Sequence, residues 1–326
     1  MIIARTLRVS RANLVCYSDS MLQFLSARSS SQPISVAPSL DRGAWIRCEK
    51  PSSDEIDQLI SLGLDADLIT DALDPHEVPR VEQDDSIVYL ITRVPDVGDE
   101  FNSFTTPIMF AVTRNHVVTL SRDSLGRLWQ PFLDKTRVAT SSQTQLLLLM
   151  LDMISQQFYA RVSAINRETR AVTSDVGLLG SKDIATLVQF ERKLNDYLDA
   201  LIPANTATEK LLGGKFLKLS EDDRDLIEDL SVDLEQVILR CKSLLRTITN
   251  VRDSYRAVMD TRLNETIRLL TVITLAVTIP TMISGLFGMN VNLPPEVQSP
   301  LTFWLIAGTS LAISLGLVYY FLRRRR

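Results

Sequence analysis

Hydroxyl-bearing and small residues recur every three or four positions in an apolar segment near the C-terminus, residues 269–290. Because an α-helix has 3.6 residues per turn, this spacing places them on one narrow face. The same spacing continues upstream through an amide and two carboxylates. Such oxygens are the ligands that hard cations and their waters prefer. The members of this polar stripe are Asp253, Asp260, Asn264, Thr271, Thr274, Thr278, Thr281, Gly285 and Gly288.

The segment that carries the stripe is long enough to cross a bilayer, which takes about 20 apolar residues. Two interpretations of the stripe stay open from the residues alone. It packs against other helices through small residues and hydroxyls, or it lines water.

A second candidate span covers residues 301–322 and is followed by four arginines, residues 323–326. A connecting loop of about ten residues, 291–300, contains no Lys or Arg, whereas four arginines precede the first span. By the positive-inside rule we expect both termini in the cytoplasm and the loop outside, in a multi-pass protein of the cell (inner) membrane. The preceding arginines are Arg252, Arg256, Arg262 and Arg268.

The composition excludes several classes of protein. The three cysteines are far apart, so neither a disulfide framework nor a thiolate zinc site is expected, and a reduced cytosolic setting fits. Residues 1–140 show no phosphate loop, nucleophile–base pair or metal-ligand cluster. We therefore expect no enzyme, no cofactor and no nucleic-acid partner. The N-terminus also lacks the pattern of a secretory signal.

The chain divides into a cytoplasmic α/β domain (residues 1–140), an antiparallel helix pair (141–219) and a stalk helix that continues into the first span (220–290). The loop (291–300), the second span (301–322) and the basic tail (323–326) follow. Strands are predicted at 44–49, 86–94, 106–113 and 116–121, and a loop at 26–38. Helices are predicted from the Ser52 capping box, at 65–73, from about 146 to 179, at 181–212, and onward from a Ser220 cap.

At Gly288-Met289-Asn290, at the end of the first span, the chain resembles the CorA family of divalent-cation channels, which includes ZntB-like zinc transporters. The order of long stalk helix, motif, short Pro-rich loop, final span and basic tail strengthens the resemblance. So do Leu73-Asp74-Pro75 and residues 79–82 before a strand. The likeness covers nearly the whole chain.

The resemblance implies a funnel-shaped homopentamer in the lipid bilayer, in which five copies of the first span line a central pore. The polar stripe would then face the axis. The residues Gly288, Met289 and Asn290 would form the selectivity filter, with a ring of Asn290 amides at the outer mouth.

Mg²⁺ dehydrates reluctantly, so neutral oxygens can select it through its waters and still release it. No acid or base lies between Arg268 and Asn290, which agrees with weak binding. Ile267 and Leu270 are candidates for a hydrophobic gate, with ordinary packing as the alternative. Glu296 is the only charged residue in the outer loop and could attract cations.

Residues 221–235 carry eight acids and one arginine. They are either a solvated helix face or, by the resemblance, part of a regulatory divalent-cation site between subunits. For that site the candidates are Asp96 and Asp229. A filled site would bridge carboxylates and keep the pore shut.

Three hypotheses follow. The first is a passive divalent-cation channel for Mg²⁺, which Co²⁺ and Ni²⁺ could also pass. The second is a ZntB-like Zn²⁺ transporter, to which the two histidines and the uncharged pore segment are poorly suited. The third is a membrane-anchored coiled-coil scaffold that does not conduct.

Overall fold

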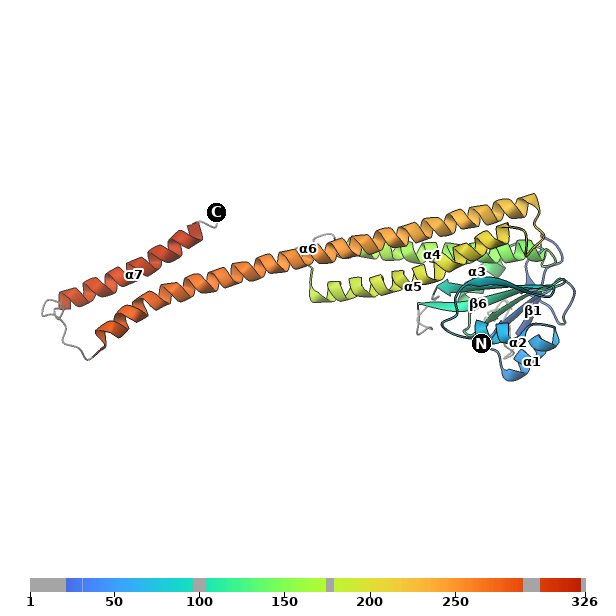
Figure 1. The fold of residues 1–326 in the computed structure, drawn as a ribbon, viewed down its shortest axis with the longest axis horizontal. Helices are drawn as coiled ribbons and strands as arrows, with labels where there is room; N and C mark the ends of the chain where they lie inside the picture. The colour runs from blue at the N-terminus through green and yellow to red at the C-terminus, as the bar shows by residue number, and fades with distance from the viewer. Residues whose placement is uncertain (1–21, 31, 96–103, 174–178, 290–299, 324–326) are drawn as a thin grey trace, which may run out of the picture. The chain divides into compact units, whose positions relative to one another are not determined.

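The computed structural model describes residues 22–30, 32–95, 104–173, 179–289 and 300–323. Three residues of the predicted sites, Asp96, Asn290 and Glu296, lie outside these ranges. The chain divides into two compact units (Figure 1). The first holds the described residues up to 248, apart from Leu179, and the second begins at Thr249.

The first unit contains a seven-stranded sheet in the order β2-β1-β3-β7-β6-β5-β4. Neighbouring strands are antiparallel except β3 and β7, which are parallel. The central strands β5 and β6 are buried almost throughout, as expected for strands covered on both faces. The strands are β1 (Leu22–Ser26), β2 (Ser35–Val36), β3 (Trp45–Glu49), β4 (Arg80–Asp84), β5 (Ile87–Pro95), β6 (Thr105–Val112) and β7 (Val117–Ser121).

Short helices α1 (Ser53–Ser61) and α2 (Ala66–Ala72) cover one face of this sheet. The Ser52 capping box is confirmed: Glu55 N donates to Ser52 Oγ, and Ser52 N donates to the Glu55 carboxylate over 2.9 Å. The same carboxylate accepts from Leu22 N at 2.9 Å, so it ties α1 to β1. This explains why a carboxylate is tolerated at a buried position.

The other face of the sheet is covered by α3 (Gly126–Lys135) and by the long helices α4 (Gln143–Val172) and α5 (Ser181–Leu212). The Trp45 ring meets the Trp129 ring edge to face, with centroids 4.9 Å apart. The Trp45 indole N–H donates to Thr119 Oγ1, so a large apolar side chain is buried with its polar atom satisfied.

Helix α6 (Glu221–Phe287) is 67 residues long, which confirms the predicted continuous helix. It spans about 100 Å at 1.5 Å per residue. Ser220 caps it as predicted: Asp223 N donates to Ser220 Oγ over 3.2 Å. Its first part belongs to the first unit and packs through residues three or four apart. These buried residues are Ile227, Leu230, Leu234, Val237, Ile238, Cys241, Leu244 and Ile248.

The four predicted strands and the helix 181–212 are confirmed, but other boundaries differ. Helix α4 ends at Val172, not near 179. The predicted loop 26–38 is wrong in part, because β2 lies inside it and pairs with β1. Strands β1 and β4 and helix α3 were not predicted.

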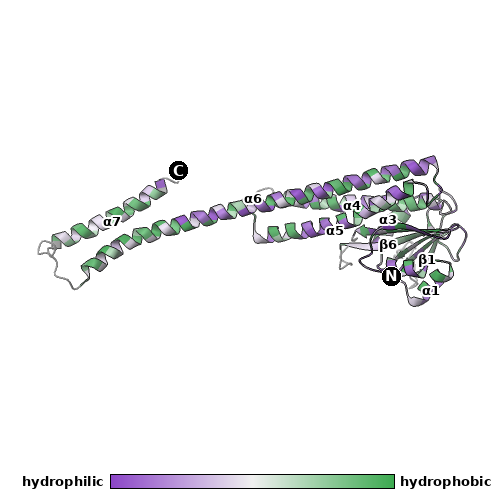
Figure 2. Cartoon of the chain, viewed as in Figure 1, coloured by the Kyte–Doolittle hydropathy of each residue, from purple (hydrophilic) through white to green (hydrophobic). Residues whose placement is uncertain are grey.

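The second unit contains the C-terminal part of α6 and α7 (Pro300–Arg323). Both helices contain a stretch that is long and apolar enough to cross a membrane. Figure 2 shows α7 and the end of α6 as predominantly hydrophobic, in contrast with the hydrophilic middle of α6.

Candidate functional site

The four threonines of the stripe lie on α6 and are exposed in the single chain. Each hydroxyl donates to the carbonyl four residues earlier: Thr271 to Ile267, Thr274 to Leu270, Thr278 to Thr274 and Thr281 to Val277, over 2.7 to 2.9 Å. The donor is therefore satisfied within the helix. The remaining lone pairs of each Oγ can accept hydrogen bonds from outside it.

Helix α7 packs on a different face of α6. Within the apolar part of α6, Val272 is the most buried residue, at 7% exposure, and Ile279 and Ile283 are partly buried. At about 100° per residue these positions lie roughly half a turn away from the threonines. The Arg268 guanidinium, on the same side as Val272, lies 6.0 Å from the Phe321 ring of α7.

A groove of about 590 Å³ separates the two helices near their connecting loop. Its α6 wall contains Pro280, Ile283 and Phe287, and its α7 wall includes Phe303 and Ile306. None of the threonines lines it, whereas the last stripe residue, Gly288, does. The threonines therefore do not pack against α7 of the same chain.

The upstream members of the stripe are exposed along the polar middle of α6. Asp260 and Asn264 are both exposed, and Asp253 lies 3.7 Å from the Arg256 guanidinium one turn away. This exposed pair contributes little to stability, and the arginine offsets part of the carboxylate charge. The candidate gate residues Ile267 and Leu270 are 52% and 64% exposed, so the described residues of the single chain do not bury them.

The structure describes two of the three motif residues. Gly288 N donates to Ser284 O over 3.0 Å and extends the hydrogen bonding of α6 past Phe287. Met289 is exposed. A Cβ placed on Gly285 would meet nothing within 4 Å, so a larger side chain there would be accommodated in the single chain.

The predicted regulatory residue Asp229 is exposed on α6, and its proposed partner Asp96 lies outside the described residues. Among the residues that the structure describes, no group of three or more His, Cys, Asp or Glu side chains could hold a metal ion. A directly coordinated metal site within one chain is therefore not supported there.

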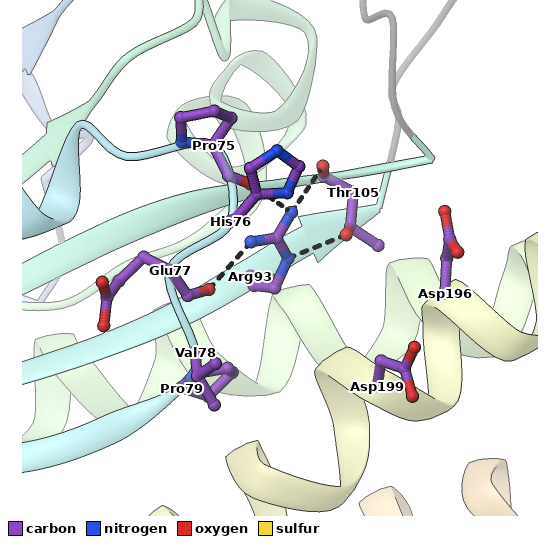
Figure 3. Close-up of a pocket in the computed structure, with 9 residues that line it drawn as sticks. All are labelled: Pro75, His76, Glu77, Val78, Pro79, Arg93, Thr105, Asp196 and Asp199. Carbon is purple, nitrogen blue, oxygen red and sulfur yellow. Dashed lines mark hydrogen bonds between the residues drawn. The ribbon is translucent and has the colours of Figure 1, made fainter.

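A polar pocket of about 350 Å³ lies beside the end of β5, and sequence reasoning missed it (Figure 3). Arg93 extends into it and holds the preceding loop. Its guanidinium donates to Pro75 O and Glu77 O over 3.0 and 2.8 Å, and to Thr105 Oγ1 and O over 2.8 and 3.0 Å. The only sequence signal was the spacing of Asp196 and Asp199, three residues apart on α5.

Charges in this pocket partly compensate one another. Burial raises the pKa of Asp196, the Asp199 carboxylate raises it further, and Arg93 lowers it. Burial also lowers the pKa of Arg93, an effect that Asp196 and Asp74 oppose. The fixed positive charge of the Arg93 guanidinium disfavours a second cation in the pocket. The clearest role of Arg93 is therefore to fix the loop before β4.

In this chain an α/β unit precedes two apolar C-terminal helices. This order defines a class, that of membrane proteins with two C-terminal spans. The family model of the CorA-like Mg²⁺ transporter protein matches residues 41–325. The chain belongs to this family. Its class is accordingly that of divalent-cation transporters, which are not enzymes.

A curated relative is the cobalt/magnesium transport protein CorA of Methanocaldococcus jannaschii, 26% identical over 302 residues, which cover 88% of this chain and 95% of that protein. The complete structure of the CorA magnesium transporter from that organism matches with a TM-score of 0.78 at 20% identity, covering 93% and 97% of the two chains. The ZntB cytoplasmic domain from Vibrio parahaemolyticus matches with a TM-score of 0.62 at 12% identity, covering 74% and 99%. The similarity to the complete structure confirms the fold, an α/β unit followed by long helices and two apolar C-terminal helices.

Proposed function

We propose that this protein is a channel through which hydrated Mg²⁺ enters the cytoplasm, and which Co²⁺ and Ni²⁺ can also pass. One observation carries the proposal: the threonine stripe lies on the face of α6 turned away from α7, with its hydroxyl donors already used within the helix. The oxygens that remain are acceptors, and the water shell of a cation presents hydrogen-bond donors.

Uncharged acceptors suit an ion that keeps its water. Mg²⁺ sheds its waters reluctantly, and several weak contacts allow it to enter a pore and leave again. The apolar part of α6 contains no acid or base after Arg268. A buried carboxylate ring would be expensive in a bilayer and would hold the ion tightly.

The channel requires several copies of the chain, and we propose five. A single α6 cannot enclose water, and its residues 261–270 are all exposed. Leu263, Ile267 and Leu270 follow one another at helical spacing, so identical helices could pack around an axis through this face. In this arrangement Ile267 and Leu270 form the gate, Asp253 and Asp260 face the cytoplasmic exit, and Asn290 forms the filter with Gly288 and Met289.

We further propose that both termini are cytoplasmic, that Glu296 attracts cations to the outer mouth, and that Asp96 and Asp229 of neighbouring chains bind the regulatory cation. Low cytoplasmic Mg²⁺ would empty that site and open the gate. The named relative, a cobalt/magnesium transport protein, supports the choice of ion.

The test is Mg²⁺ flux into liposomes reconstituted with the purified protein. Asn290→Ala should reduce the flux to the level of empty liposomes, because the filter amide is lost, while the oligomeric mass stays unchanged. The matched control is Asn292→Ala, which changes the same residue type outside the motif. Unchanged flux in Asn290→Ala would contradict the proposal.

The second candidate function is Zn²⁺ transport, and the observation in its favour is the fold similarity to the ZntB cytoplasmic domain. The same liposomes, loaded with Zn²⁺- or Mg²⁺-sensitive dye and tested with and without a pH gradient, separate the two. Faster Zn²⁺ flux that depends on the pH gradient would favour the zinc transporter. No flux of any divalent cation would favour a non-conducting scaffold.

A further inference from the structure

The groove between the two apolar helices of the second unit is lined by one face of each helix. On α6 the lining residues run from Pro280 to Gly288, and on α7 from Phe303 to Leu311, in both cases at positions i, i+3, i+4, i+7 and i+8. This spacing is that of a single helix face. The two faces are directed at one another but leave about 590 Å³ between them. The groove is therefore built by one chain.

The walls of this groove are apolar and uncharged (Figure 2). Phe287, Phe303 and Leu311 line it and are exposed in the single chain, so large apolar side chains border open space. No charged side chain is among the described residues that line it. The hydroxyl of Ser310, a buried residue of the α7 wall, already donates to Ala307 O over 2.9 Å. Such a space holds water poorly, because a buried water typically makes about three hydrogen bonds.

The position of the groove along the helices matches one leaflet of a bilayer. Both walls belong to helices that are long and apolar enough to cross a membrane. From Pro280 to Gly288, α6 rises about 12 Å at 1.5 Å per residue. One leaflet of the hydrocarbon core is about 15 Å deep. The groove therefore extends through most of the leaflet on the side of the connecting loop.

We propose that this groove binds an acyl chain of a membrane phospholipid. The chain is flexible and apolar, so it can fill the space between Phe287 and Phe303 and supply dispersion contacts that an empty groove lacks. The competing occupant is a second copy of the protein. In the proposed channel, however, the copies meet through the face of α6 that carries the threonines, and none of these lines the groove. Because Gly288 belongs to the wall, the bound lipid would lie against the first residue of the candidate filter.

A phospholipid with a photoactivatable diazirine in its acyl chain tests the site in liposomes that contain the full-length protein. After illumination, mass spectrometry should find the label on Ile283, a partly buried residue of the groove wall. Leu305 is exposed and stands between two groove residues in the sequence, but it does not line the groove. Its label therefore measures contact with the surrounding bilayer. An unlabelled Ile283 beside a labelled Leu305 in the wild-type protein would overturn the proposal.

Substitutions that fill the groove should displace the lipid. Ala307→Phe should lower the ratio of Ile283 label to Leu305 label about fivefold, because a ring in the groove leaves too little space for the chain. Ser284→Phe fills the same space from α6 and should act alike. The matched control is Ala312→Phe, which changes an exposed alanine of α7 outside the groove and should leave the ratio unchanged. A ratio that stays at the wild-type value in both filling variants would contradict the site.

Two further measurements identify a different occupant. If a second copy filled the groove, Ile283 would stay unlabelled and Ala307→Phe would lower the oligomeric mass in native mass spectrometry. If water filled it, Ile283→Cys would react with a water-soluble thiol reagent. Either result would overturn lipid binding. Asn290→Ala should keep the label on Ile283, so that loss of transport and loss of this site are scored separately.

Discussion

A stripe threonine on α6 presents a hydrogen-bond acceptor to its surroundings. Its hydroxyl hydrogen is directed to a backbone carbonyl, over 2.7 Å in the case of Thr278. The oxygen can then only accept. An oxygen that accepts suits the hydrogen-bond donors of a cation's water shell, which is the role proposed for the stripe.

Thr278→Val tests this property with little change in side-chain shape. The variant removes the acceptor and should slow Mg²⁺ flux in liposomes about fivefold, which corresponds to roughly 1 kcal/mol at the barrier for one hydrogen bond. Thr278→Ser retains the oxygen and should conduct at close to the wild-type rate.

The matched control for this substitution is Thr309→Val. Thr309 lies on α7 and its hydroxyl donates to Leu305 O over 2.8 Å, the same pattern as in α6. If Thr309→Val slowed flux as much as Thr278→Val, the slower flux would result from a general change in helix stability rather than from the loss of an acceptor in the stripe.

At the scale of elements, α6 has two faces with different surroundings in the second unit. Val272 and Ile283 face α7, and the threonines face away from it. Cysteine substitution along the helix should reveal this division. In the reconstituted protein, Thr274→Cys and Thr278→Cys should react with a water-soluble thiol reagent, because their face would border water in the proposed pore, whereas Val272→Cys should react at least tenfold more slowly.

The native cysteines allow this measurement. Cys48 and Cys241 are buried, and burial raises the pKa of each to about 12, so both remain unreactive thiols at neutral pH. Cys16, outside the described residues, is replaced by serine. If the threonine positions react no faster than Val272→Cys, the stripe is sealed and the transport proposal loses its main support.

At the scale of helices and strands, some features could be predicted from the sequence and others could not. The length of α6, the Ser220 cap and the 181–212 helix were readable because caps, breakers and a long uninterrupted pattern act locally. The Arg93 pocket was not, because its residues meet only after helices and strands pack. The face of α6 that contacts α7 was also inaccessible, since apolar residues occupy both sides of the threonines.

At the scale of the whole molecule, the single chain exposes apolar surface that a soluble monomer would bury. On α6, Leu263 is 59% exposed beside Ile267 and Leu270. Leu263 and Ile267 lie just before the apolar segment, which begins at residue 269, and Leu270 lies in its first turn. Uncovered apolar surface of this kind indicates association with other chains, and the symmetry of identical chains favours a closed ring.

Native mass spectrometry of the detergent-solubilised protein tests the proposed ring. We expect a species of about 183 kDa, five times the chain mass of 36.6 kDa. Leu270→Lys should lower the proportion of this species, because charges would be brought together on the packed face, whereas Leu301→Lys changes an exposed residue at the start of α7 and should retain it. A dominant mass of one or two chains in the wild-type protein would contradict the ring, since neither can surround an aqueous path with α6 helices.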